Sequence, residues 1–339
     1  MTDNNTAKHD LYKEIEAGVA AREKTLIFSY DCSGEVFDVF KKVLSDHPEI
    51  FWLTGSAKYM KRTDQNGTTI RLEPAFRSQG QILDERIERF NEAVQKIVNR
   101  AEKLKTPYDK LLFCHDTLVD ETEYDKGAAE LVISNGPGVE KSESTGAYGC
   151  LVRHHAVCSG YSAALQVLAG RLGIPCARIH GTDLRSGAPH EWNIVELEGE
   201  WYHVDVTWDD PIYAGGGGFR VHDYFCVDTA TILYNHTIES GQNVPKCTAN
   251  ACNYYVKSGL CLDGYDREST SAFIEKHVGP EIRIKYPNKA ASLAAAKDLF
   301  ENKAMFSIPA VKAYQPNSLR YSASDLGTLS IALIKQETK

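Results

Sequence analysis

The stretch AVCSGYSAALQVLAGRLGIP, residues 156–175, joins a cysteine to an apolar run that ends in glycine and proline. The large apolar residues after Cys158 recur at helical spacing, at Tyr161, Leu165, Leu168 and Leu172. Gly173 and Pro175 then stop the predicted helix. Cys158 therefore lies at a helix N-terminus, where unpaired N–H groups and the helix dipole favour a thiolate and can stabilise an oxyanion.

A cysteine at a helix start is weak evidence by itself. The chain holds nine cysteines at unpatterned spacing, so one of them near a helix start is expected by chance. Cys176 gives a comparison, because it lies in the apolar run IPCARIH (174–180), where a buried and inert thiol is expected. A catalytic role for Cys158 requires a base and a group that orients the base.

The stretch HEWNIVELEGEWYHVDVTW, residues 190–208, supplies both groups. Its residues alternate in character on both sides of Glu198-Gly199, which predicts a β-hairpin. The hairpin loop has either two residues (198–199) or four (196–199), which is an even number in both cases. A loop with an even number of residues places His190 and Asp205 on the same face of the hairpin. His203 lies on the same face as a competing base, but His190 at the strand start is preferred.

A thiol, an imidazole and a carboxylate that approach one another predict a cysteine hydrolase or acyltransferase. We expect His190 to take the proton of Cys158, while Asp205 orients the imidazole. The thiolate then attacks an amide carbonyl and forms a thioester. Trp192 and Trp208 flank the pair and are candidate substrate contacts.

These segments together resemble a known family. The order VCSGYSAALQVLAGRLGIPC, HEWNIVELEGEWYHVDVTWDDP and HDYF is similar to the transglutaminase-like superfamily, and most of all to its microbial cysteine proteases, over residues 103–236. The resemblance implies an α+β fold with a papain-like core, in which a helix carries the cysteine and an antiparallel sheet carries the other two groups. It also implies that Cys158 is the nucleophile, His190 the base and Asp205 the orienting acid.

The chain departs from the family at two positions. Ser159 stands where a glutamine is common, and Glu191 stands where an alanine is common. The first change removes an amide donor and leaves Tyr124 and Ser159 as the oxyanion candidates, Tyr124 because an aromatic residue before the family core can contribute such a contact. Strand alternation turns Glu191 away from the triad, so the second change concerns substrate contacts.

The flanks of this core show one pattern twice. TLIFSY (25–30), a helix near 36–44 and the hairpin AKYMKRTDQNGTTIRLEPAF (57–76) are followed, near the other end, by IRIKYPN (282–288), ASLAAAKDLFEN (291–302) and the alternating runs 304–314 and 318–334. We predict a core at 81–240 between smaller α/β modules at 1–80 and 241–339. The flanks are either a degenerate repeat, whose copies could pair into one sheet, or two examples of a common βαββ order.

Two further segments are open to interpretation. Residues 127–147 are small and polar and are predicted to be a loop. The glycine-rich stretch YAGGGGF (213–219) is either a mobile flap or a disordered loop.

The composition narrows the classes of partner. A formal net charge of −8 argues against nucleic acid or an anionic membrane as partner, and no apolar run is long enough to span a bilayer. The polar start has no signal-peptide pattern, so a cytoplasmic location with reduced thiols is expected, although secretion is not excluded.

A metal site is the alternative to scattered buried thiols in the second half of the chain. Its candidate ligands are His222, Cys226, His236, Cys247, Cys252 and Cys261. They lack the paired Cys-x-x-Cys spacing of zinc sites, so we expect no metal and no cofactor.

Three functions agree with these observations. The first is a cysteine peptidase or amidase acting on a peptide or protein, which we prefer because water is always available to resolve the thioester. The second is a transglutaminase-type crosslinking enzyme, and the third is a non-catalytic scaffold. The substrate and the oligomeric state cannot be predicted from one sequence.

Overall fold

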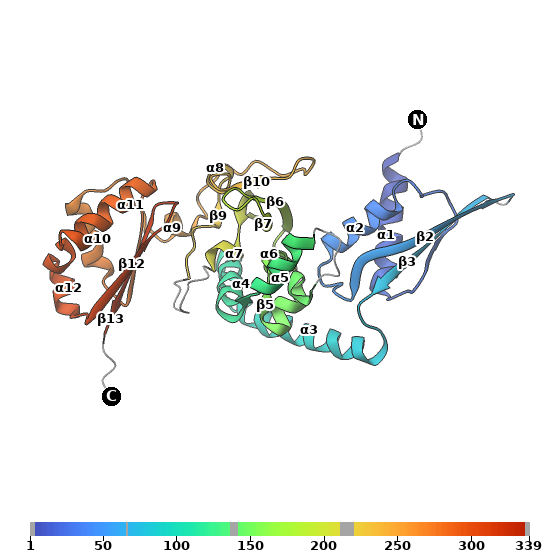
Figure 1. Ribbon diagram of the computed structural model, residues 1–339, viewed down its shortest axis with the longest axis horizontal. Helices are drawn as coiled ribbons and strands as arrows, with labels where there is room; N and C mark the ends of the chain where they lie inside the picture. Colours follow the sequence, from blue (N-terminus) through green and yellow to red (C-terminus); the bar gives the residue numbers. More distant parts are fainter. Residues whose placement is uncertain (1–3, 66, 136–141, 211–219, 336–339) are drawn as a thin grey trace. The chain divides into compact units, whose positions relative to one another are not determined.

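The computed structural model describes residues 4–65, 67–135, 142–210 and 220–335. The chain forms two compact units, and Figure 1 labels most of their helices and strands. The first comprises Met1–Gly199, Val204–Thr207 and Asn235–Pro245, and the second comprises Glu200–His203, Trp208–Tyr234 and Lys246–Lys339. The three-module division at residues 80 and 240 stays a prediction, and the glycine-rich segment 213–219 lies outside the described residues.

The first unit begins with a helix and a small antiparallel sheet. Its elements are α1 (Asn4–Ala20), β1 (Leu26–Phe28), α2 (Val36–Asp46), β2 (Leu53–Asp64) and β3 (Gly67–Phe76), and the strand order is β1-β3-β2. The residues Val36, Phe40 and Val43 recur at helical spacing, and all three are buried in α2. The apolar face of α2 therefore packs inward, as its sequence pattern requires.

A group of helices follows. These are α3 (Gly80–Ala101), α4 (Pro107–Glu121), α5 (Lys126–Asn135) and α6 (Cys158–Arg171). Helix α4 begins where Thr106 caps it, because the Thr106 hydroxyl accepts a hydrogen bond from the Asp109 N–H at 3.0 Å and Pro107 occupies the first helical position. The loop prediction for 127–147 is wrong at its start, since the good helix formers of 126–135 form α5.

The sheet of the first unit lies against α6. Strands β6 (Cys176–Asp183), β7 (Pro189–Leu197) and β10 (His236–Ile238) are antiparallel in the order β10-β6-β7. The Ser162 hydroxyl of α6 bonds to Glu191 at 2.5 Å, and the Asn193 amide donates to the Ser162 carbonyl at 2.9 Å. Alternate residues of β7 therefore face α6, and those between them face the other side of the sheet.

The turn after β7 has the geometry that the sequence predicts. Strand β7 ends at Leu197 and β8 (Glu200–Val204) begins three residues later. Glu198 and Gly199, the two residues between, have φ angles of 56° and 82°. Two positive φ angles are typical of a type I′ hairpin turn, so the two-residue loop is the observed one.

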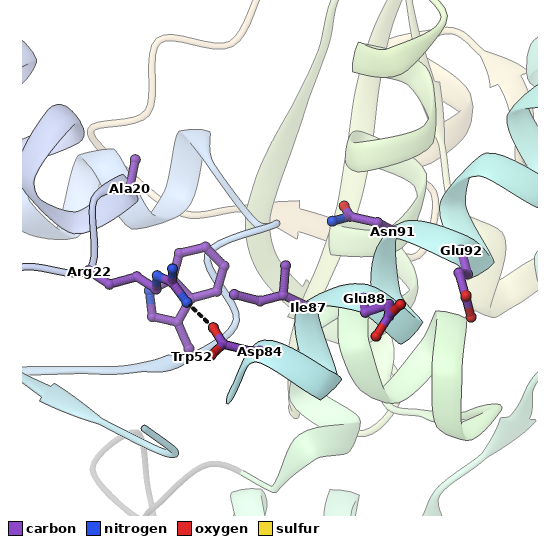
Figure 2. A pocket seen from close by; sticks show the side chains of 8 residues that line it. All are labelled: Ala20, Arg22, Trp52, Asp84, Ile87, Glu88, Asn91 and Glu92. Carbon is purple, nitrogen blue, oxygen red and sulfur yellow. Dashed lines mark hydrogen bonds and ion pairs between the residues drawn. The ribbon is translucent and has the colours of Figure 1, made fainter. Parts of the chain in front are cut away.

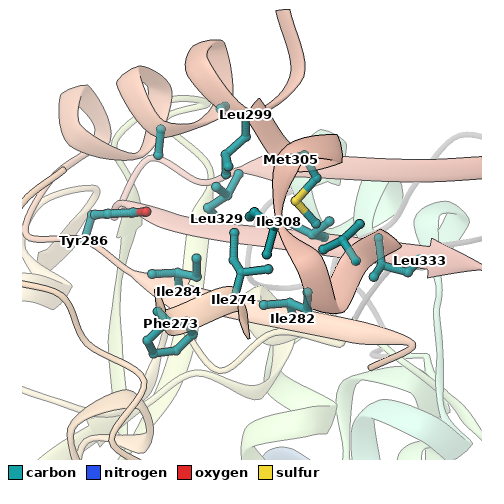
Figure 3. Packing of buried hydrophobic residues seen from close by; sticks show 14 residues of the cluster. Phe273, Ile274, Ile282, Ile284, Tyr286, Leu299, Met305, Ile308, Leu329 and Leu333 are labelled. Carbon is teal, nitrogen blue, oxygen red and sulfur yellow. The ribbon is translucent and has the colours of Figure 1, made fainter. Parts of the chain in front are cut away.

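The second unit contains most of the other helices and strands after β7, although the end of β8 and the start of α7 belong to the first unit. They are β8, α7 (Val206–Asp209), β9 (Phe225–Val227), α8 (Thr229–Ile232), α9 (Tyr254–Lys257), α10 (Arg267–His277), β11 (Glu281–Lys285), α11 (Lys289–Ala296), α12 (Pro309–Tyr314), β12 (Ser318–Ala323) and β13 (Thr328–Ile334). The sheet order is β11-β13-β12. Figure 3 shows the apolar core of this sheet, where Ile282 and Ile284 of β11 lie near Ile274 of α10.

The two flanking segments share one strand order. In each, a strand is followed by a helix and a hairpin, and the last strand pairs with both others. The described strands of the two flanks form two separate three-stranded sheets, so the idea of one joint sheet is wrong. Residues 304–314 are also not extended, because Pro309 starts α12, and the second hairpin lies wholly within 318–334.

The chain as described combines helices with mainly antiparallel sheets, in agreement with the predicted α+β class. Among the described residues, no helix is both long enough and apolar enough to cross a membrane.

Candidate active site

Cys158 is the first residue of α6, as predicted. Its N-cap is Val157, and the Val157 N–H donates to the Ser144 carbonyl at 2.9 Å. Gly160 allows this close approach, because a Cβ there would lie 2.4 Å from the Ser144 oxygen. The side chain of Cys158 is partly exposed, and its thiol is hydrogen-bonded to His190.

His190 is joined to Asp205 as well as to the Cys158 thiol. The Nε2 atom of His190 lies 2.6 Å from Oδ2 of Asp205, and both side chains are buried. Burial by itself lowers the pKa of His190, but the charge and hydrogen bond of Asp205, with the contact from Cys158, outweigh it and raise that pKa well above its usual value. Burial likewise raises the pKa of Asp205, but His190 and His236 lower it well below its usual range.

His236 is a member of this cluster that the sequence analysis placed elsewhere. Its Nε2 atom lies 3.0 Å from the same Asp205 oxygen, and its Nδ1 atom bonds to Oδ1 of Asn235 at 2.7 Å. The other Asp205 oxygen accepts the N–H of Thr207 at 3.1 Å. Asp205 is therefore held from three directions, and the pairing of β10 with β6 brings His236 to it.

Trp192 supports the two imidazoles. It is 1% exposed, and its ring lies 6.0 Å from that of His190 and 5.1 Å from that of His236. Gly181 makes room for this indole, since a Cβ there would lie 2.7 Å from it. Trp208 belongs to the second unit, where its ring packs against Tyr224.

Tyr124 and Ser159, the two candidates for binding the oxyanion, differ in whether their hydroxyl proton already has an acceptor. Burial, and then the charges of Cys158 and Asp205, raise the pKa of Tyr124 to about 12, so this phenol stays a proton donor. Ser159 donates its hydroxyl proton to the Thr145 carbonyl at 3.1 Å. As the first two residues of α6, Cys158 and Ser159 also carry N–H groups with no acceptor inside the helix.

The competing base and the comparison thiol have partners of their own. His203 is fully buried in the second unit and lies 3.3 Å from the Thr229 hydroxyl. Burial raises the pKa of Cys176 to about 12, and its sulfur bonds to Asn193 at 3.4 Å. Cys176 is partly exposed rather than buried, but its raised pKa disfavours the thiolate, as expected of an unreactive thiol.

Glu191 lies on the opposite face of β7 in a cluster of ions. Its carboxylate lies 3.0 Å from Arg178 and 3.2 Å from His180, and it bonds to Ser162. Burial raises the pKa of Glu191, but Arg178, His180 and Ser162 outweigh it and lower the pKa to about 2. Glu191, one of the two residues that depart from the family pattern, is therefore a carboxylate held in its charged form on the opposite side of the strand from Asp205.

Among the described residues of the first unit, one group of side chains has the geometry of a metal site. His190, Asp205 and His236 each offer a ligand atom, and these atoms lie within 4.8 Å of one another. All three already take part in hydrogen bonds. His236, one of the predicted metal candidates, thus lies with the predicted triad.

Two cavities of the first unit differ in their relation to these residues. One cavity, of about 660 Å³, is shown in Figure 2. Arg22 forms an ion pair with Asp84 there, and the side chains of Trp52 and Ile87 line the cavity wall. No predicted site residue lines it. The other, of about 820 Å³, is lined by Ser159 and Glu191, and each directly follows a residue of the thiol–imidazole pair.

Comparison with known proteins identifies the segment that carries this site. Residues 95–206 match the model of the transglutaminase-like superfamily, so this part of the chain is a transglutaminase-like core. The predicted resemblance to this superfamily is thereby confirmed for residues 95–206, and the predicted fold class agrees with the match. No curated protein matches the chain.

Several solved structures are similar over part of their length. A TGase is 14% identical, with coverage of 65% of this chain and 61% of that one and a TM-score of 0.32. A putative cysteine protease from Cytophaga hutchinsonii is 15% identical, with coverage of 46% of this chain and 63% of that one and a TM-score of 0.28. A putative protease from Parabacteroides distasonis ATCC 8503 is 7% identical, with coverage of 84% of this chain and 63% of that one and a TM-score of 0.30. The chain thus spans less than two thirds of each of these proteins.

Proposed function

We propose that this protein is a cysteine-dependent amide hydrolase that acts on a peptide or protein. The observation that supports it most is the set of contacts around His190, whose ring bonds to Asp205 on one side and to the Cys158 thiol on the other. Asp205 occupies Nε2, which leaves Nδ1 for the thiol. This is the nucleophile, base and orienting acid that acyl transfer requires.

The reaction follows from these contacts. The Cys158 proton passes to His190, and the sulfur attacks the amide carbonyl carbon to form a tetrahedral oxyanion. The imidazolium then gives its proton to the amide nitrogen, the C–N bond breaks, the amine leaves and a thioester remains. Water, deprotonated by His190, attacks the thioester, so that a carboxylic acid is released and the thiol is restored.

The Tyr124 phenol and the N–H groups at the start of α6 are the donors we assign to the oxyanion. Tyr124 keeps its proton because its pKa is raised to about 12. Electrostatic stabilisation of this kind is usually the largest single contribution to acyl transfer. We assign no such role to the Ser159 hydroxyl, because its proton is bonded to the Thr145 carbonyl.

A peptide library digested with the full chain tests the proposal. Wild-type protein should release new N-termini detectable by mass spectrometry, and Cys158→Ala should release none. Cys176→Ala is the matched control, since it removes another thiol of the same unit that lies away from His190. Equal cleavage by wild type and Cys158→Ala, or cleavage by neither, would overturn the hydrolase assignment.

The same assay separates hydrolysis from transamidation. With a primary amine added, a hydrolase continues to release carboxylic acid, whereas a transglutaminase incorporates the amine at a glutamine and releases ammonia. A scaffold role predicts that any cellular or binding activity survives in Cys158→Ala.

A further inference from the structure

The cavity of about 820 Å³ in the first unit, called the side cavity below, is the strongest unexplained feature of the molecule. Its walls come from residues 41–56, from residues 75–77 with Arg86, and from residues 142–191. Ser159 and Glu191 line it. Because consecutive Cα atoms are about 3.8 Å apart, its wall begins one residue from Cys158 and from His190.

Cationic side chains dominate the lining. Lys41, Arg77, Arg86 and Arg178 are set against two acids, Glu143 and Glu191. Both acids have cationic partners, since Arg86 lies 2.6 Å from Glu143 and Arg178 lies 3.0 Å from Glu191. The described lining therefore holds four basic side chains and two acidic ones, and an excess of basic side chains favours an anionic ligand.

Three buried donors of the lining lack an acceptor. The Oη atom of Tyr148 and the Nε atoms of Arg86 and Arg178 have no hydrogen-bond partner among the described residues. Tyr148 is 2% exposed, and the Arg86 guanidinium lies 4.3 Å from the centre of its ring. Buried donors without acceptors are uncommon and costly, so a ligand that brings acceptor oxygens is expected to stabilise this wall.

We propose that the side cavity binds a carboxylate of the substrate and thereby selects acidic peptides. This inference rests on the proposed amide hydrolase, because Ser159 and Glu191 of the lining directly follow Cys158 and His190 in the chain. The carboxylate could come from an Asp or Glu side chain, or from the free C-terminus of the peptide. The two sources share the chemistry of two acceptor oxygens with one negative charge, which suits guanidinium and phenol donors.

Binding to the inactive full chain tests the inference without any need for cleavage. The probes are N-acetylated, C-amidated hexapeptides with one Glu at each position in turn, the matching Gln series, and one Gln peptide with a free C-terminus. Titration of Cys158→Ala should show at least one Glu peptide, or the free acid, binding about tenfold more tightly than its neutral counterpart. Equal binding by all three kinds of peptide would overturn the inference.

Two substitutions localise the effect to the cavity. Lys41→Gln should reduce the preference for the carboxylate by several fold, because it removes a lining cation. Lys42→Gln is the matched control, since the neighbouring Lys42 pairs with Asp46 and does not line the cavity. The inference fails if both variants change the preference equally.

Tyr148→Phe separates a binding role from a structural one. It removes an unpartnered buried hydroxyl, so the protein should melt at an equal or higher temperature while carboxylate binding weakens. Unchanged carboxylate binding in Tyr148→Phe would contradict a contact between this phenol and the ligand.

The two proposals fail separately. If Cys158→Ala prefers Glu peptides but wild type cleaves nothing, the cavity is a carboxylate site and the hydrolase proposal is wrong. If wild type cleaves Glu and Gln peptides equally and Cys158→Ala binds them equally, the hydrolase stands and the carboxylate site does not.

Discussion

Strand β7 holds two neighbouring residues in opposite electrostatic settings. On one face His190 contacts Asp205 and Cys158, and on the other Glu191 contacts Arg178, His180 and Ser162. Burial opposes the charge of both residues. Yet the pKa of His190 is raised and that of Glu191 is lowered to about 2, because each has partners of opposite charge.

The partners decide what each face can do. Cys158 can give up a proton, so the His190 face can move one between sulfur and nitrogen. The partners of Glu191 are an arginine, a histidine whose pKa Glu191 itself raises, and a serine hydroxyl. The Glu191 face therefore holds its charge in place and joins α6 to the sheet.

The largest effect is expected on the His190 face. Asp205→Asn keeps the size of the side chain but removes the charge that holds the His190 imidazolium, so kcat/KM for peptide cleavage should fall by about 10⁴-fold. The variant should retain the circular dichroism of the wild type. A loss below about tenfold would show that Asp205 does not act on His190 during the reaction.

Glu191→Gln should weaken the fold. Breaking this buried ion pair leaves Arg178 without its anion, so the free energy of unfolding should fall by about 3 kcal/mol near neutral pH. The Glu191 pKa is lower in the folded state, so its stabilisation is present above about pH 4.3, the usual Glu pKa, and is lost as the pH falls toward 2. Urea unfolding over this range should show the two proteins converging in acid, and a constant difference would contradict the ion pair.

His236→Phe tests the second imidazole on Asp205. The ring can still pack on Trp192, but the 3.0 Å bond to Asp205 is lost. We expect kcat/KM to fall about tenfold with little change in melting temperature, because Asp205 is held less firmly. The pH–rate profile should also move, since the Asp205 charge then acts on His190 alone. A parallel loss of stability and activity with an unmoved profile would indicate a structural role only.

Ser162→Ala should give the smallest change, on the Glu191 face. It removes one hydrogen bond to a charged partner, which costs about 1 to 2 kcal/mol of stability. Thermal melting measures this loss, and Ser134→Ala on α5 is the control, because its hydroxyl bonds only to the backbone of its own helix. Equal effects of the two substitutions would mean that Ser162 does not support Glu191.

Local patterns in the sequence predict much of this arrangement. Apolar spacing and the Gly-x-Pro end place Cys158 at the start of α6, and the period of two along β7 places His190 and Glu191 on opposite faces. The two-residue turn at Glu198-Gly199 follows from the same alternation. These features depend on neighbouring residues, and a sequence pattern reports such short-range order directly.

Other features depend on contacts between distant segments. His236 reaches Asp205 only because β10 pairs with β6, and no spacing in the sequence indicates this pairing. The side cavity likewise needs residues 41–77 beside residues 142–191. The strand misassigned at 304–314 shows a different limit, since its alternating pattern is overridden by Pro309 at a helix start.

Thiol reactivity tests the central claim most directly. Iodoacetamide labelling of all nine cysteines from about pH 4 to pH 9, read by peptide mass spectrometry, compares wild type with His190→Ala. Of the nine cysteines, all within the described residues, Cys261 alone is exposed, so it would react fastest if access decided the rate. We predict that Cys158 reacts fastest in acid and that His190→Ala abolishes this advantage. Faster labelling of Cys261, or an unchanged Cys158 rate in His190→Ala, would contradict the account.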